Sequence, residues 1–149
     1  MSEQKLATYI ACDHAGVLLK RHLMAVIPQI NWVDLGSHNE ESVDYPDYAS
    51  KLCEQLSQAP PEARGVLICG SGQGMAMRAN RYPTIRAALV WSKDSARLAR
   101  EHNDANVVCL GSRLVSMGLA QELLRIFLET PFEGGRHLRR VEKISQPIS

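Results

Sequence analysis

The chain has 149 residues, the length of one ordinary domain, and can bury a sizeable core without disulfides or metal. Its net charge of +1 argues against a general nucleic-acid or membrane-surface partner. No window is apolar over a membrane-spanning length, and the first residues lack the pattern of a secretory leader. We therefore expect a cytoplasmic protein that binds neither nucleic acid nor membrane.

Short apolar runs alternate with stretches of helical period along the whole chain. The expected strands are 7–13, 31–36, 65–70, 85–91 and 105–111, and the expected helices are 17–27, 48–56, 74–80, 93–100 and 114–128. Near-continuous apolar strands indicate burial on both faces, as in a parallel sheet covered by helices. The pattern predicts one α/β domain over 1–149, a three-layer α/β/α sandwich with a five-stranded parallel, Rossmann-like sheet.

The four cysteines form no CxxC pair, and no nearby histidine pair has zinc spacing; they are Cys12, Cys53, Cys69 and Cys109. Cys69 stands out because the glycine loop 70–74 follows it directly. Such a loop between a strand and a helix points backbone N–H groups at an anion and favours the thiolate of a nearby cysteine. A tight turn with a small thiol packed in the core is the alternative, and spacing alone favours that alternative.

Ligands of parallel sheets bind beyond the carboxyl ends of the strands, where the strand order reverses. The residues expected at that edge are Asp13, His14, 36–37, 69–74, Ser92 and 111–113. The first strand-to-helix turn reads CDHAG instead of GxGxxG, and GxxxxGK[ST] is absent, so neither NAD nor ATP is expected. A thiol, N–H donors and cationic side chains together fit proton abstraction next to the carbonyl of an anionic substrate.

Each of the other candidates also has a plain structural explanation. The Asp13–His14 pair fits a helix cap, and His102 fits a helix end, where a histidine interacts favourably with the macrodipole. Loop packing or a solvated surface accounts for the remainder, which are Tyr45, Arg113 and the basic cluster 136–140. An exposed helix surface is the interpretation for three consecutive residues, Lys20, Arg21 and His22. The residues alone therefore indicate an α/β domain with an anion site and a candidate thiol base.

Five motifs, taken in order across residues 9–144, carry the interpretation further. They are CDHAG at 12–16, DYPDYA at 44–49, ICGSGQGM at 68–75, SARLAREHNDANVVCLGSR at 95–113 and FEGGRHLRRVEKI at 132–144. Together they resemble ribose-5-phosphate isomerase type B, a family that extends to galactose-6-phosphate and allose-6-phosphate isomerases. The resemblance implies interconversion of ribose 5-phosphate and ribulose 5-phosphate through an enediolate, in the pentose phosphate pathway, with no metal or other cofactor.

The resemblance also implies roles for the matching positions. Cys69 would be the base that moves a proton between C1 and C2 of the open-chain sugar, and Met75 places the chain in the cysteine-base branch of the family. The developing enediolate would be held by Ser71 and by backbone N–H groups of the loop Gly70, Ser71, Gly72, Gln73 and Gly74. His102 would open the furanose ring, and its helpers would be Asp13 and Tyr45.

Binding of the rest of the substrate follows from the same resemblance. Asn103 would bind substrate hydroxyls, and the phosphate would be held by His14, Arg113, Arg136 and Arg140. Two alternatives stay open: the same chemistry on a six-carbon sugar phosphate, or a sugar-phosphate-binding module without turnover. The presence of both Cys69 and His102 argues against the module, because a binder needs neither a base nor a ring-opening acid.

The distance of the basic cluster from the catalytic loops predicts a homo-oligomer with shared active sites, either a dimer or a dimer of dimers. The helix expected at 114–128 carries the chain roughly 22 Å back from the carboxyl edge. From Thr130 to Arg136 the chain spans at most about 20 Å. Arg136 is therefore not expected to return to its own chain's site, and His102 has the same difficulty because it ends the helix that begins near Lys93. A neighbouring subunit could supply either group or both, and the C-terminal helical tail, about 131–149, is expected to pack on that partner.

Overall fold

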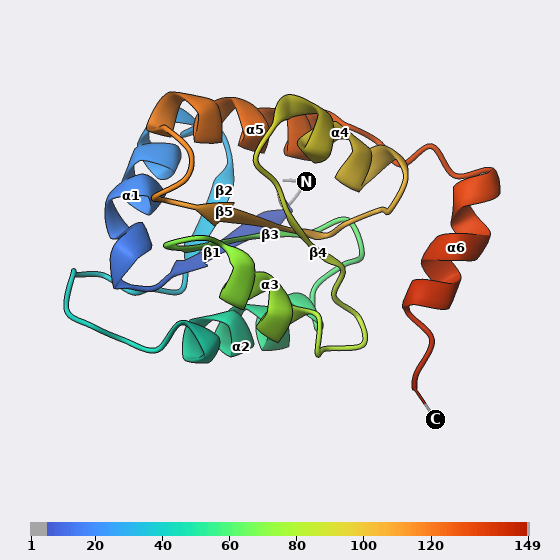
Figure 1. The fold of residues 1–149 in the computed structure, drawn as a ribbon, viewed down its shortest axis with the longest axis horizontal. Helices are drawn as coiled ribbons and strands as arrows, with labels where there is room; N and C mark the ends of the chain where they lie inside the picture. The colour runs from blue at the N-terminus through green and yellow to red at the C-terminus, as the bar shows by residue number, and fades with distance from the viewer. Residues whose placement is uncertain (1–5, 149) are drawn as a thin grey trace, which may run out of the picture.

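The computed structural model describes residues 6–148, in which strands and helices alternate along the chain (Figure 1). The first half comprises β1 (Ala7–Cys12), the 3-10 turn η1 (His14–Gly16), α1 (Val17–Val26), β2 (Asn31–Asp34), α2 (Tyr45–Leu56) and β3 (Arg64–Cys69). The second half comprises α3 (Gln73–Ala79), β4 (Ala87–Leu89), α4 (Lys93–Glu101), β5 (Val107–Gly111), α5 (Met117–Glu129) and α6 (Arg136–Ile144).

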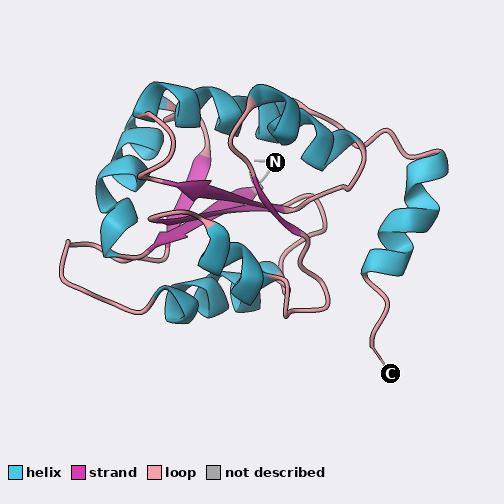
Figure 2. Cartoon of the chain, viewed as in Figure 1, coloured by secondary structure: helices cyan, strands magenta, loops and turns pink. Residues whose placement is uncertain are grey.

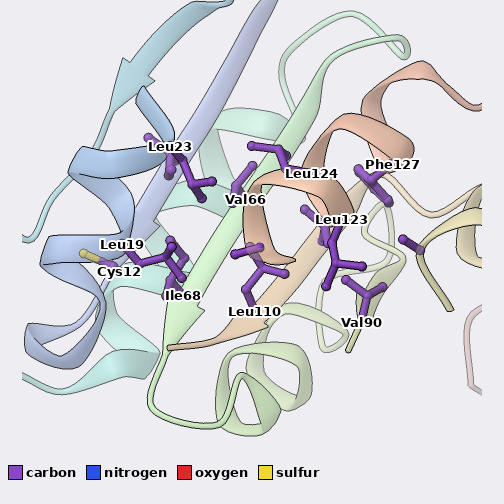
Figure 3. Close-up of a cluster of buried hydrophobic side chains, with 14 of the residues drawn as sticks. Cys12, Leu19, Leu23, Val66, Ile68, Val90, Leu110, Leu123, Leu124 and Phe127 are labelled. Carbon is purple, nitrogen blue, oxygen red and sulfur yellow. The ribbon is translucent and has the colours of Figure 1, made fainter. Parts of the chain in front are cut away.

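The five strands pair in the order β2-β1-β3-β5-β4, and every pairing is parallel. The strands form the middle layer in Figure 2, with α1, α4 and α5 on one face and α2 and α3 on the other. Side chains from α1, β3, β5 and α5 fill the first interface, as Figure 3 shows for Leu23, Val66, Leu110 and Leu124. The predicted three-layer α/β/α sandwich is confirmed.

The chain leaves β1 toward β2 on one side of the sheet, while β3 pairs with β1 on the other side. This is the reversal of strand order at which parallel sheets open a crevice, because the connections after the two strands diverge. The carboxyl ends of β1 and β3 therefore frame the place where a ligand site is expected.

Several boundaries differ from the predicted ones because side chains cap the elements. α2 begins at Tyr45 instead of 48, since Pro46 occupies its first turn, where a missing N–H has no cost. α5 begins at Met117 because the Ser116 hydroxyl accepts the backbone N–H of Leu119. β4 is short, Ala87–Leu89, and the Asn80 side chain donates to the Ala87 carbonyl and accepts the Ala87 N–H. Ser92 lies between β4 and α4, at the expected edge, where it caps α4 and does not line the cleft.

The C-terminal part of the chain leaves the sandwich after α5, and α6 stands beside the body in Figure 1. Its connection contains Gly134 and Gly135, both with positive φ (67° and 55°). Leu138 and Ile144 of α6 are 49% and 57% exposed. The predicted helical tail is therefore present and offers apolar side chains to solvent. Within residues 6–148, no helix combines the length and the apolarity needed to cross a membrane.

Candidate active site

A cleft of about 450 Å³ opens at the carboxyl ends of β1, β3 and β5. Its lining includes eight of the predicted site residues, and the full set is Asp13, His14, Ala15, Tyr45, Cys69, Gly70, Ser71, Gly74, Arg113 and Leu114. These residues come from four separate stretches of the chain, which the parallel register brings to one edge. The predicted thiol, glycine loop and part of the predicted phosphate site thus share a single concave surface.

Cys69 is the last residue of β3, and its Sγ accepts the backbone N–H of Gly72 at 3.2 Å. Gly72 has a φ of 77°, a backbone conformation that is unfavourable for residues with a side chain. In this conformation its N–H points back toward the sulfur. A hydrogen bond to the sulfur stabilises a thiolate more than a thiol. The start of the glycine loop therefore aims a backbone donor at the sulfur of the proposed base.

The other three cysteines have a different environment. Burial raises the pKa of the Cys53 thiol to about 12, and burial also raises the pKa of Cys12 and, strongly, that of Cys109. All four cysteines belong to the hydrophobic clusters on the two sides of the sheet, and Cys69 differs in being 4% exposed and in lining the cleft. These three thiols stay neutral at ordinary pH. Among the four cysteines, Cys69 is the one that lines the cleft and accepts a backbone N–H at its sulfur.

The glycine loop lets two side chains approach the backbone closely. A methyl group on Gly70 would lie 2.9 Å from Nη1 of Arg113, and one on Gly74 would collide with the ring of Tyr45. The backbone N–H of Arg113 donates to the Gly70 carbonyl at 3.0 Å, so the end of β5 fixes the loop. A cation and a phenol therefore lie against the backbone of the glycine loop.

Asp13 and His14 follow β1 and are oriented by backbone groups. The carboxylate of Asp13, whose residue is 6% exposed, accepts the N–H of Ala15 at 3.0 Å. Nδ1 of His14 accepts the N–H of Val43 at 3.2 Å, so the neutral imidazole carries its proton on Nε2. The second ring nitrogen is thereby left as a donor, which suits an anionic ligand.

Four predicted site residues lie away from this cleft in the same chain. His102 caps the carboxyl end of α4, and Asn103 lines a separate cavity of about 730 Å³ beside the C-terminal segment. Arg136 and Arg140 are exposed on α6. Helices run opposite to the strands in this fold, so the end of α4 lies at the amino edge of the sheet. One chain therefore separates the predicted ring-opening histidine from the predicted base.

His102 has its own neighbours at that edge. Its ring stacks on the ring of His137, with centroids 4.2 Å apart and planes 15° from parallel, and His137 Nε2 lies 3.4 Å from a carboxylate oxygen of Glu133. The potential ligand atoms of these three side chains lie within 4.8 Å of one another. An ion binds a histidine in the plane of its ring, and stacked rings cannot both point at one ion. The arrangement fits ring stacking better than a metal centre.

The interpretation of Lys20 as an exposed residue is wrong, because Lys20 is 1% exposed. Its ammonium group donates to Asp34 Oδ1 and to the carbonyl of Ser37, each at 2.7 Å. A helical spacing signal was present: Lys20 lies three residues after Val17 and three before Leu23, both fully buried. A lysine in the apolar stripe of a helix, with an aspartate ending the next strand, is the pattern that indicates a buried ion pair.

The molecule is an α/β domain whose cleft brings a thiol, a glycine loop and an arginine together. A family model described as ribose/galactose isomerase matches residues 8–144. The chain belongs to this family of sugar-phosphate isomerases, as the comparisons with individual proteins also show.

The relatives cover nearly the whole chain. Ribose-5-phosphate isomerase B of Escherichia coli is 39% identical over 136 residues, which are 90% of this chain and 91% of the relative. YwlF of Bacillus subtilis, described as a sugar phosphate isomerase, is 43% identical over 139 residues, 91% of this chain and 93% of the relative.

Solved structures give the same result. A ribose 5-phosphate isomerase from Thermotoga maritima superposes with a TM-score of 0.89 at 45% identity, covering 95% of this chain and 99% of that one. Ribose-5-phosphate isomerase B from Mycoplasma genitalium with bound ribulose-5-phosphate gives a TM-score of 0.88 at 40% identity, with 96% of each chain covered. The fold is therefore that of the family throughout.

Proposed function

We propose that this chain interconverts D-ribose 5-phosphate and D-ribulose 5-phosphate, with Cys69 as the base. The observation that carries the proposal is the thiol of Cys69, which accepts the Gly72 N–H inside a cleft that also holds Arg113 and His14. The bound ribulose-5-phosphate of the Mycoplasma genitalium protein supports the choice of a five-carbon substrate.

The proton transfer needs one base and a set of donors for the oxygen that becomes charged. The Cys69 thiolate takes the proton from C2 of the open-chain aldose, and the electrons of that bond form the double bond of an enediolate. Ser71 and the N–H groups of the loop stabilise the negative oxygen, because fixed donors cost no reorganisation during the reaction. One proton passes from the C2 hydroxyl to O1, the Cys69 thiol returns the carbon-bound proton to C1, and the C=C electrons form the C2 carbonyl of the ketose.

The phosphate holds the substrate away from the reacting carbons. Arg113 and the Nε2 proton of His14 lie in the same cleft as Cys69 and can donate to its oxygens. An arginine pairs with phosphate through two parallel contacts and so fixes orientation as well as charge. Binding energy spent on the phosphate then serves to align C1 and C2 with the thiol.

Ring opening is assigned to a second copy of the chain. The furanose form must gain a proton on its ring oxygen and lose one from its C1 hydroxyl, and His102 is the proposed acid. Because His102 and Arg136 lie outside the Cys69 cleft of their own chain, a partner subunit would supply both groups. The exposed Leu138 and Ile144 of α6 give that partner an apolar contact.

A panel of aldose phosphates tests the proposal. The purified full chain should convert ribose 5-phosphate faster than allose 6-phosphate or galactose 6-phosphate, as measured by formation of the ketose phosphate. In D₂O, deuterium should appear at C1 of ribulose 5-phosphate if solvent exchanges with the thiol during turnover. Faster turnover of a six-carbon sugar would reassign the substrate, and tight binding without any turnover would favour a binding module.

A further inference from the structure

Lys20 has the smallest exposed fraction among the charged residues in the described part of the chain, at 1%. It lies on α1, far in sequence from the two groups that it contacts, Asp34 at the end of β2 and the carbonyl of Ser37. Burial alone would raise the pKa of Asp34, but hydrogen bonds from Lys20 and Gly36 and the charge of Lys20 hold that pKa below its usual range. The Asp34 carboxyl is therefore charged at neutral pH.

Ser37 is the residue through which this ion pair reaches the end of β1. The backbone N–H of Ser37 donates to the carbonyl of Cys12 at 2.9 Å, and the N–H of Cys12 donates to the carbonyl of Gly36 at 2.7 Å. Cys12 immediately precedes Asp13. By holding the Ser37 carbonyl, Lys20 fixes the backbone that pairs with the last residue before the cleft.

The same segment continues into the loop that orients His14. Arg21 donates to the carbonyl of His38 at 2.6 Å, so two consecutive side chains of α1 hold two consecutive carbonyls. The loop then runs through exposed residues to Val43, whose N–H donates to Nδ1 of His14. The loop is thus anchored at its start by α1 and at its end by the imidazole that it orients.

Stability alone is a weak reason for such a pair. Removing the Lys20 charge from water costs several kcal/mol, while the Asp34 side chain stays 26% exposed, and an apolar residue of similar volume in place of such a buried charge is often as stable or more so. The ammonium group does what an apolar residue could not, because it supplies a donor to the buried Ser37 carbonyl. The location of that carbonyl, beside the end of β1, points to the cleft.

We infer that Lys20 is a positioning residue of the Cys69 cleft: through Ser37 and the loop 38–44, it fixes the end of β1 and the tautomer of His14. The inference rests on the proposed function, since His14 is there a phosphate ligand. Lys20 touches neither the cleft lining nor the thiol, so its effect passes entirely through backbone geometry.

Replacement of Lys20 by methionine removes the charge and keeps the length of the side chain. We expect kcat/KM for ribose 5-phosphate to fall about 10- to 100-fold, because small misplacement of positioning groups costs rates of this order. In ¹⁵N NMR, the separate Nδ1 and Nε2 signals of His14 should move toward each other as the fixed tautomer is lost. Lys93→Met is the matched control, since it breaks an exposed ion pair with Glu122 and should leave both readouts unchanged.

The double variant Lys20→Met/Asp34→Asn separates positioning from stability. It leaves no uncompensated charge, so its unfolding free energy should recover relative to Lys20→Met alone, while kcat/KM should stay low because Ser37 still lacks its donor. Recovery of wild-type kcat/KM and of the His14 signals in the double variant would overturn the inference. If the wild-type chain turns over no sugar phosphate, the proposed function fails, and the His14 signals still decide the role of Lys20.

Discussion

At the carboxyl edge of the sheet, backbone hydrogen bonds from three strands bring the thiol, the glycine loop, Asp13, His14 and Arg113 into one cleft. At the amino edge, His102 ends α4, and the basic residues of α6 lie on a helix beside the body (Figure 1). The carboxyl edge is assembled within one chain, whereas the groups at the amino edge lie outside the Cys69 cleft of that chain. Under the proposed function, the two edges are complementary halves that meet only between two copies.

The largest expected effect concerns the base of the carboxyl edge. Cys69→Ala should lower kcat by about 10²–10⁴-fold, because that is the usual contribution of a general base. Competitive inhibition by inorganic phosphate should change little, since the phosphate ligands remain. Cys53→Ala is the control: that thiol is buried in the core on α2, so the variant should lose stability but keep kcat. A kcat near the wild-type value in Cys69→Ala would remove Cys69 from the mechanism.

Mixing inactive chains tests whether the two edges meet across an interface. Cys69→Ala chains combined with His102→Ala chains should regain about a quarter of wild-type activity, because half of randomly formed dimers are mixed and each has one intact site. The same recovery is expected with Arg136→Ala/Arg140→Ala chains. Mixed dimers, verified by mass spectrometry, that show no activity would place these groups in their own chain's site.

The affinity for inorganic phosphate, measured in variants of Arg113 and Arg140, compares one residue from each edge. Arg113→Ala should weaken inhibition by inorganic phosphate about 10- to 100-fold, since hydrogen bonds to charged groups contribute roughly 1.5–3 kcal/mol. Arg140→Ala should weaken it by a similar factor only where dimers form. Inhibition constants measured at protein concentrations above and below the dimer dissociation constant distinguish an Arg113 that acts within its own chain from an Arg140 that acts across the interface. Equal effects of Arg140→Ala at both concentrations would contradict an intersubunit phosphate site.

The smallest effect concerns acid stability at the carboxyl edge. The pKa of Asp34 is lower in the folded chain than in the unfolded chain, so its stabilising contribution is present above the unfolded pKa and is lost as pH falls through the folded one. Asp34→Asn should therefore flatten the decline of the unfolding free energy between about pH 4 and the lower folded pKa. Urea titrations across this range measure the slope, and an unchanged slope would contradict the assignment.

The two edges also differ in how much of them the sequence could predict. Strand ends are marked by glycines and polar residues, and parallel pairing places all carboxyl ends together, so Asp13, His14, Cys69 and Arg113 could be placed at one edge from the strand pattern. Tyr45 could not, because it comes from the start of α2. The position of α6 did not follow, because it depends on the torsions of Gly134 and Gly135 after a fixed start at Thr130. Lys20 was misassigned because residue type suggested exposure while its helical position indicated burial.

The backbone conformation of Gly135 favours a D-residue over an L-residue at this position. Its φ of 55° and ψ of −130° are the mirror image of the polyproline region, and a Cβ built on either Gly134 or Gly135 meets nothing within 4 Å. Space is therefore available, and only chirality keeps other residues out. D-alanine at position 135 would suit this backbone and leave the direction of α6 intact, whereas L-alanine would turn the helix elsewhere. The direction of α6 therefore depends on an achiral residue at position 135.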